Sequence, residues 1–208
     1  MTSTAERRLI EHVDRIEAEH PPVPLESVDF TVLRPDVMRD RFGGVLDYLA
    51  RVELEVDRNV LELNTMLADP PEIDLRFYRD VWHAQEIRHG LILDRLQTII
   101  GRSPATTDTD SVSAKMRVLG ALSHLSPVQD IVRMLYYLTG ISTERSAVIA
   151  YNRLHSGMAE LGEAAVADTW WPRSAGRSRR TTRSTSCPRS VSPIGCRRGR
   201  RGSPVGYG

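Results

Sequence analysis

A glutamate and a histidine three positions apart are the clearest chemical feature of this 208-residue chain. They are Glu86 and His89, within the stretch Trp82-His-Ala-Gln-Glu-Ile-Arg-His-Gly90. Residues three apart share one face of a helix, so this carboxylate and this imidazole would project together as two ligands of one metal ion. Many helices contain one Glu-x-x-His by chance, and the pair predicts a metal site only if other elements supply further ligands.

A long helix before this pair is expected to supply the next ligand. Apolar residues recur at steps of three and four over about residues 36–68, before the terminating Asp69-Pro70-Pro71. At 100° per residue, Glu53 lies roughly 60° from the centre of the apolar stripe and Glu55 roughly 100° away on the other side. Glu53 is therefore the better candidate ligand, and exposure of both acids to solvent is the alternative. The stripe consists of Val45, Leu49, Val52, Val56, Val60, Leu63 and Leu67.

A second long helix, over about residues 72–100, positions Glu86 and His89. Gly101 is expected just beyond its C-terminus. His89 lies near the centre of the apolar face and Glu86 toward one edge, whereas His83 and Arg88 are expected at the surface. The predicted apolar face consists of Tyr78, Val81, Trp82, Ile92, Leu96 and Ile99.

A third long helix carries another acid, Glu144. Ser126-Pro127-Val128-Gln129 has the pattern of a capped helix start, with a serine cap and a proline in the first position. The helix is expected to continue to about His155, with a kink at Gly140 and a break after His155. His155 itself is expected to be structural or exposed. Glu144 lies on the apolar stripe, which is predicted to be buried and consists of Ile131, Leu135, Leu138, Ile141 and Val148.

The remaining elements complete an all-α chain in three parts. Residues 1–34 are expected to form a helix, over residues 5–19, and an extended connector. Residues 35–171 are expected to form a helical bundle that also contains a short helix at about residues 112–125 and a last helix from Met158 to Trp171. Residues 172–208 are rich in Arg, Ser, Pro and Gly and are expected to be a disordered tail.

Charge is distributed unevenly along the chain. Residues 173–208 contain ten Arg and no acid, so residues 1–172 hold 18 basic and 27 acidic groups. Two cysteines, Cys187 and Cys196, do not indicate a disulfide framework. The charged N-terminus and the lack of a long apolar run predict a cytoplasmic protein with no signal peptide and no membrane association.

Together these residues predict a ferritin-like bundle. Di-iron carboxylate bundles take one Glu from each of two helices and a Glu-x-x-His from each of the other two. The chain has a buried acid, then Glu-x-x-His, then another acid, which is three of those four elements in order. Carboxylates with imidazole suit iron or manganese.

Two short motifs resemble soluble acyl-carrier-protein desaturases, over roughly residues 40–170. Trp82 to Leu91 resembles their stretch of tryptophan followed by Glu-Glu-Asn-Arg-His-Gly, and Thr143-Glu-Arg-Ser-Ala147 is similar to their Gln-Glu-Arg-Ala-Thr. The resemblance implies an iron-dependent oxidoreductase that uses O2 to dehydrogenate an acyl chain on an acyl carrier protein. It also implies a ferredoxin-type reductant and a homodimer. The metal ligands that it implies are Glu53, Glu86, His89 and Glu144.

The chain departs from the family in lacking a second Glu-x-x-His after Glu144 and the N-terminal segment with Trp and Pro. The missing motif belongs near residue 177, because Glu53 and Glu86 are 33 residues apart. A shifted reading of Pro172 to Thr185 permits Pro-Ile-Ser-Arg-Gln-Glu-Pro-Ala-His, so the hypothesis is that residues 172–208 are translated out of frame; a native basic tail is the alternative. Impaired activity and exposed core surfaces that favour oligomers are then expected.

Other functions remain open from the sequence. One is another ferritin-like oxidase, such as an amine N-oxygenase or a rubrerythrin-like protein, because the metal ligands are shared. A second is a non-catalytic helical protein whose Arg tail binds nucleic acid, but Tyr207 is the tail's one aromatic residue for base stacking. The simplest alternative makes Glu86 and His89 ordinary helix residues.

Overall fold

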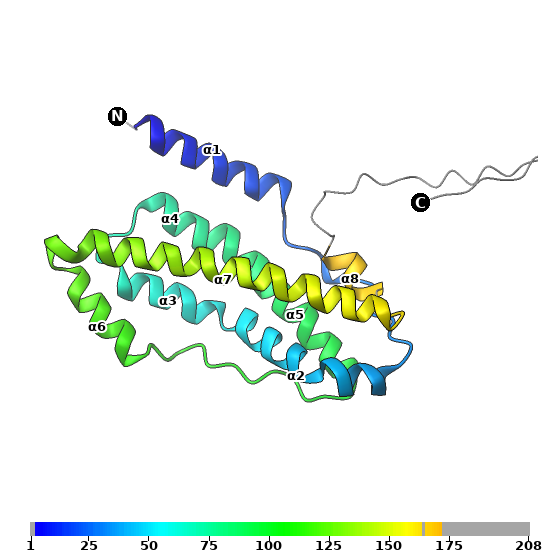
Figure 1. Cartoon of the computed structure of the whole chain (residues 1–208). Coiled ribbons are helices and arrows are strands. Elements are labelled where there is room, and N and C mark those ends of the chain that lie inside the picture. Colours follow the sequence, from blue (N-terminus) through cyan, green and yellow to red (C-terminus); the bar gives the residue numbers. More distant parts are fainter. Residues whose placement is uncertain (1–2, 164, 172–208) are drawn as a thin grey trace, which may run out of the picture. The chain divides into compact units, whose positions relative to one another are not determined.

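The computed structural model describes residues 3–163 and 165–171, and over these residues the protein is helical with no strand (Figure 1). The expected all-α class is therefore confirmed. The predicted disorder of residues 172–208 and the shifted-frame hypothesis concern positions outside the described residues. The N-terminal helix α1 (Thr4–Glu19) begins with a capping box, in which Ser3 and Glu6 exchange side chain to backbone hydrogen bonds. A short 3₁₀ turn, η1 (Leu25–Ser27), interrupts the connector that follows.

The first long helix predicted from the sequence is two helices, α2 (Pro35–Leu54) and α3 (Val56–Met66), so the prediction of one continuous helix was wrong. They meet at Glu55, whose ψ of 12° departs from helical geometry. The Glu55 carboxylate lies 2.5 Å from Arg58 Nη2 and accepts a hydrogen bond from the backbone N–H of Asp108. No Gly or Pro lies at this position, so helix propensity does not predict the break. The Glu55 carboxylate contacts a loop that is distant in sequence at this point.

The buried face of α2 is also rotated from the predicted stripe. Val45 and Val52, expected in the core, are exposed, while Leu49 in α2 and Val56, Leu63 and Leu67 further along are buried as predicted. The face that packs inward carries Leu46, Leu49, Ala50 and Glu53. Glu53 therefore lies on the buried face itself, and the prediction that it points inward is confirmed.

The helix that bears Glu-x-x-His contains a segment of π-helix. It runs through α4 (Glu72–Arg76), the π-helical η2 (Phe77–Trp82) and α5 (His83–Ile99) without leaving helical conformation. The expected helix is confirmed, but nothing in the sequence analysis predicted the π-helix, a feature frequent at functional sites. Gly101 follows the helix with φ of +82°, as predicted, whereas Ile99 is exposed rather than buried.

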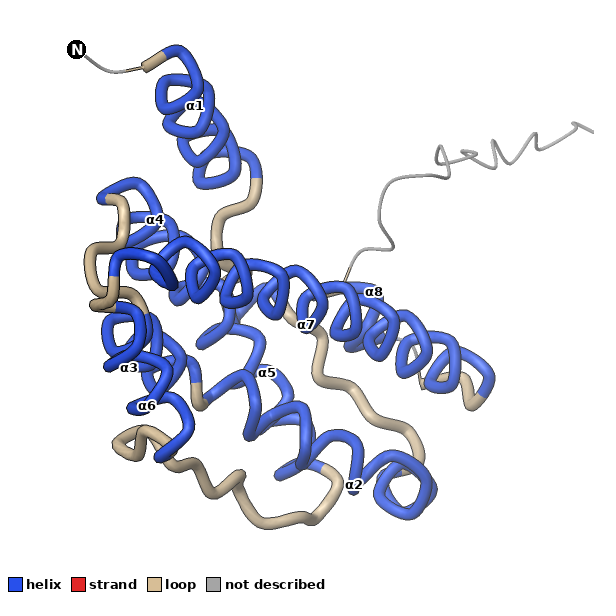
Figure 2. The backbone as a smooth tube through the Cα atoms, turned by 60° about the vertical axis from the view of Figure 1, so that its left-hand side comes forward, coloured by secondary structure: helices blue, strands red, loops and turns tan. Residues whose placement is uncertain are grey.

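The most extensive helix pair joins α2 to α5 (Figure 2). Gly90 permits this close approach, because a Cβ at this position would lie 2.7 Å from Leu54 Cγ and 3.0 Å from the Leu54 backbone nitrogen. Leu46 and Leu49 of α2 and Ile92 of α5 belong to the same buried core. The core thus fixes the spacing of the two helices that carry Glu53, Glu86 and His89.

Substitution Gly90→Ala is expected to destabilise the protein by about 1–3 kcal/mol, because the added methyl group overlaps Leu54 and must push the two helices apart. The matched control is Gly44→Ala on α2, where a Cβ meets nothing within 4 Å. That change is expected to be neutral or to stabilise by about 0.5–1 kcal/mol. Urea unfolding of both variants measures the difference, and equal stability would contradict the close contact.

The last described helices of the chain are α6 (Ala114–Ser123), α7 (Ser126–Glu160) and α8 (Ala165–Trp170). Helix α7 is continuous through Gly140 and through Ser156-Gly157, so the predicted break after His155 was wrong. Ser126 is its first residue and makes no capping hydrogen bond. The last helix begins at Ala165 rather than Met158, after a turn in which Gly162 has φ of +73°.

Helix α7 buries a different face from the one predicted. All five residues of the predicted stripe, Ile131, Leu135, Leu138, Ile141 and Val148, are exposed. The inward face instead carries Val132, Tyr151, Leu154, His155 and Met158. Because apolar residues occupy both sides of α7, periodicity alone does not show which side faces the core.

Helices of the described residues are too short or too polar to cross a bilayer.

Candidate metal centre

Glu53, Glu86 and His89 form one compact group of metal-ligand type. Each offers an atom within 4.8 Å of the atoms offered by the others. Glu53 comes from the buried face of α2, and the other two come from adjacent turns of α5. His89 Nδ1 lies 3.6 Å from Glu86 Oε2. Three of the four residues predicted as ligands are therefore brought together.

The group is short of positive charge. Burial, with the adjacent Glu86 adding to it, raises the pKa of Glu53 from 4.5 to about 9. Burial also raises the pKa of Glu86 and lowers that of His89, so the charged form of each is disfavoured. Among the described residues, no Lys or Arg forms an ion pair with Glu53 or Glu86. A bound cation would supply the missing charge, and carboxylate oxygens with an imidazole nitrogen suit iron or manganese.

Tyr151 of α7 is the nearest hydrogen-bonding partner that the sequence analysis missed. Its buried hydroxyl donates a hydrogen bond to Glu53 Oε1. Its ring lies 4.6 Å from that of Trp171, and the Trp171 indole N–H donates to Asn152 Oδ1 at 3.2 Å. The available signal was spacing, since Tyr151 follows Glu144 by seven residues and so shares its face of the helix.

Substitution Tyr151→Phe is expected to weaken metal binding by about 10-fold, because partners that orient a ligand affect affinity by about 10–100-fold. Titration of the metal-free protein with Mn²⁺, followed by electron paramagnetic resonance, measures the affinity. Tyr48→Phe is the matched control, since Tyr48 is an exposed tyrosine of α2. Equal affinity in the two variants would show that the Tyr151 hydroxyl does not orient Glu53.

Glu144 is not part of the compact group. It is exposed on α7, and its carboxylate accepts a hydrogen bond from Trp82 Nε1 at 3.0 Å. Partial burial of the carboxylate raises its pKa. Its charge also adds to the raised pKa of Glu86 and opposes the lowering of the His89 pKa by burial, which indicates that it lies near the centre. Its burial was predicted wrongly, and its role as a fourth ligand stays a prediction.

Other ionisable residues singled out by the sequence have partners elsewhere. Glu55 is buried but pairs with Arg58, away from the group. His83 Nε2 lies 2.6 Å from Asp57 Oδ1, and the buried His155 lies 2.7 Å from Asp168 Oδ1. His155 is therefore buried rather than exposed, and its interpretation as structural stays a prediction.

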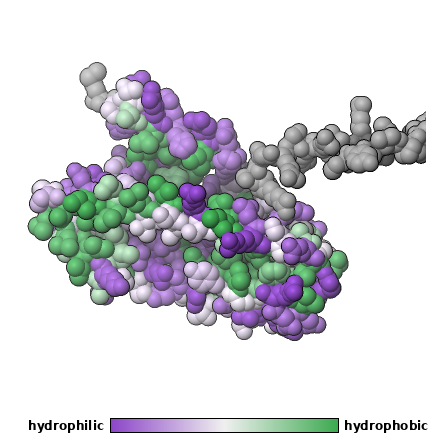
Figure 3. Space-filling model, viewed as in Figure 1, coloured by the Kyte–Doolittle hydropathy of each residue, from purple (hydrophilic) through white to green (hydrophobic). Residues whose placement is uncertain are grey.

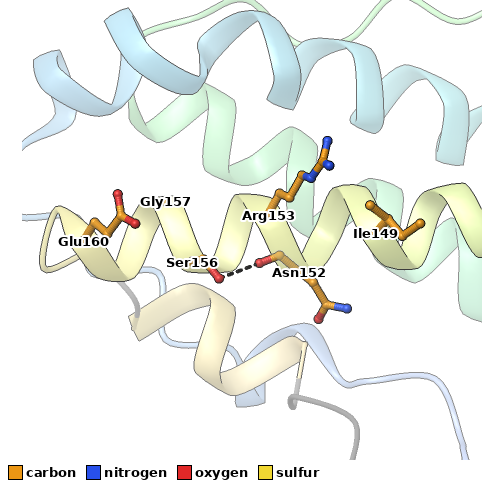
Figure 4. Close-up of a pocket in the computed structure, with 6 residues that line it drawn as sticks. All are labelled: Ile149, Asn152, Arg153, Ser156, Gly157 and Glu160. Carbon is orange, nitrogen blue, oxygen red and sulfur yellow. Dashed lines mark hydrogen bonds between the residues drawn. The ribbon is translucent and has the colours of Figure 1, made fainter.

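A surface hollow of about 530 Å³ lies along the C-terminal part of α7 (Figure 4). All six lining residues come from this one helix, and none belongs to the Glu-Glu-His group. Ile149 and Arg153 point to one side of the helix, whereas Asn152 points toward α8. The hollow is thus a feature of the outer surface of α7 and not an entrance to the candidate centre. Its lining residues are Ile149, Asn152, Arg153, Ser156, Gly157 and Glu160.

Comparison of the chain with protein-family models, curated proteins and solved structures finds no match. The resemblance to desaturases therefore rests on the two short motifs alone. The candidate metal centre consists of two carboxylates and one imidazole, held by helices of the described part of the chain.

Proposed function

We propose that this protein binds a single iron or manganese ion through Glu53, Glu86 and His89 and is an impaired relative of O2-dependent di-iron oxidoreductases. The metal proposal rests on one observation. Two glutamates and a histidine, whose charged forms are disfavoured by burial, lie close together, and no Lys or Arg among the described residues forms an ion pair with the glutamates. Burying such acids is costly unless a cation compensates them. Glu144 is the proposed fourth ligand.

The finer proposal is dehydrogenation of an acyl chain on an acyl carrier protein, in a ferritin-like bundle. It is supported by the order of acid, Glu-x-x-His and acid on successive long helices and by the two desaturase-like motifs. Bound iron would supply O2-dependent oxidation, with electrons from a ferredoxin-type reductant. The protein's own contribution is to hold one ion with Glu53, Glu86 and His89 and to surround it with core side chains that limit access of water.

The other Glu-x-x-His of the described residues, Glu17 and His20 at the end of α1, lies outside the compact group, and its Glu17 pairs with Arg76. A second metal is therefore left with at most half of its ligands. We therefore propose little or no desaturase activity in this chain. An amine N-oxygenase or a rubrerythrin-like oxidase shares the same ligands, and assays with amine and peroxide substrates separate these from an acyl-chain oxidase.

Metal analysis of the full chain, purified after expression with iron or with manganese, tests the proposal. One metal ion per chain is expected in the wild-type protein and a loss of at least about 10-fold in affinity in Glu86→Ala. A wild-type protein that binds no metal above the level of Glu86→Ala overturns the metal site. Two tightly bound irons with turnover of an acyl carrier substrate overturn the proposed impairment instead.

A further inference from the structure

Helix α7 presents an unusually apolar outer surface, here called the α7 stripe. Its seven large side chains are between 42% and 65% exposed. At 100° and 1.5 Å per residue they fall within an arc of about 140° and extend over about 27 Å of helix. Figure 3 shows hydrophobic surface gathered over the N-terminal half of α7 and over α6. The α7 stripe consists of Ile131, Met134, Leu135, Leu138, Ile141, Val148 and Ile149.

Such a surface is larger than monomers ordinarily expose to water. From these exposed fractions, the seven side chains present on the order of 700 Å², against about 300–600 Å² for the largest apolar patch of a typical monomer. Between residues 131 and 149, Arg145 is the one charged residue within the arc. The opposite side of the same helix already packs into the core, so α7 is apolar on both sides, as expected of a helix covered on both sides.

We propose that the α7 stripe is the interface through which two copies of this chain form a symmetric dimer. The area supports this occupant, because a stable interface buries about 800 Å² from each partner and the stripe, at on the order of 700 Å², approaches that size. A two-fold interface needs only one patch that is complementary to itself, which two antiparallel copies of an apolar helix face provide.

The chain's own remaining residues are poor candidates to cover the stripe. Residues 172–208 contain ten Arg and few apolar residues, with none of the three- and four-residue repeats that an apolar helix face requires. A second copy of α7, by contrast, offers a matching apolar face of the same length. The surface hollow that Ile149 to Glu160 line continues the outer face of α7 beyond the stripe residue Ile149 (Figure 4).

This proposal is independent of the metal centre. Glu144 and Tyr151 lie roughly 110–130° around the helix from the middle of the stripe. A failed dimer would leave metal binding untouched, and a failed metal site would leave the dimer untouched.

Sedimentation velocity of the full chain over a concentration series tests the dimer. The wild-type protein is expected to be a dimer, and Leu138→Glu, which places a charge in the middle of the stripe, is expected to weaken association at least about 10-fold. Ile141→Glu is a second variant with the same expectation. Both side chains are exposed in the single chain, so circular dichroism and metal content are expected to match those of the wild type.

The control is Tyr48→Glu, an exposed residue of α2 that lies outside the α7 stripe, and it is expected to leave the dimer intact. A wild-type protein that stays monomeric at every concentration overturns the proposal, as do aggregates of no fixed size. Retention of the dimer in both stripe variants, or its loss in Tyr48→Glu alone, places the interface elsewhere and also overturns it.

Discussion

Replacing Glu53 by glutamine is expected to abolish metal binding and at the same time to stabilise the metal-free protein above pH 7. Burial raises the pKa of Glu53 to about 9, so holding its charged form in the core costs free energy in the absence of a cation. Glutamine keeps an acceptor for the Tyr151 hydroxyl but carries no charge. The expected gain is about 1–3 kcal/mol, the usual cost of a poorly compensated buried polar group.

The opposite signs of these two effects separate a binding role from a structural one. A residue that only supports the fold would lower both stability and metal binding when replaced. Urea unfolding in the presence of a chelator measures the first effect, and metal titration measures the second. A Glu53→Gln protein that is less stable than the wild type, or that binds metal with unchanged affinity, would contradict the role assigned to Glu53.

Glu55→Gln is the matched control, because it changes another buried acid only two residues away. Its carboxylate pairs with Arg58 at 2.5 Å and accepts a hydrogen bond from the Asp108 N–H. Loss of this pair is expected to destabilise the protein by about 1 kcal/mol, as for a partly exposed ion pair with additional hydrogen bonding. Metal affinity is expected to stay unchanged, so the two substitutions differ in sign for stability and in outcome for binding.

The second large effect is a fall in the stability of the metal-free protein as the pH rises from about 6.5 to 9. The folded-state pKa of Glu53, about 9, exceeds its ordinary value of 4.5, so the folded protein binds more protons than the unfolded chain in this range. Stability from this group is complete below pH 4.5 and is lost as the pH rises toward 9. Each pH unit removes up to about 1.4 kcal/mol per such group.

His89 acts in the opposite direction at lower pH, because burial lowers its pKa below 6.5. The stability associated with its neutral form is lost as the pH falls through and below that value. Because these two effects oppose each other below pH 6.5, the stability of the metal-free protein is expected to decline with rising pH mainly above about pH 6.5. Metal affinity is expected to rise over the same alkaline range, because the ligands must lose their protons.

Urea unfolding with and without Mn²⁺, at several pH values from 6.5 to 9, measures both trends. In Glu53→Gln the alkaline decline of the metal-free protein is expected to be shallower, since one of the titrating acids is gone. A metal-free wild-type protein whose stability is constant or rises with pH would show that Glu53 is not held in its neutral form.

Much of the candidate centre could be predicted because its ligands are local in sequence or follow helix geometry. Glu86 and His89 share a helix face by their spacing alone, and Glu53 follows from its angle to an apolar stripe. Spacing places Tyr151 on the same face of its helix as Glu144, but it does not predict the hydrogen bond to Glu53. That bond depends on how α7 is rotated against α2, which no spacing within either helix specifies.

The predictions that failed share one physical cause. Between residues 131 and 149, apolar residues recur at helical spacing on both sides of α7. The sequence therefore determines a helix there but not which of its faces is buried. The same applies to Val45 and Val52, whose spacing fits a buried stripe while the core takes Leu46 and Ala50 instead. The break at Glu55 and the π-helix from Phe77 to Trp82 also have no local sequence signal.

The sequence by itself determined the helical class, the main helical segments and the local pairing of Glu86 with His89, because these depend on short-range periodicity and termination signals. Only the tertiary structure decided that Glu53 joins that pair while Glu144 lies apart, that Tyr151 holds a carboxylate oxygen, and that the α7 stripe faces outward. These outcomes depend on the packing of helices that are distant in sequence, with Gly90 against Leu54 setting the spacing between the two ligand-bearing helices.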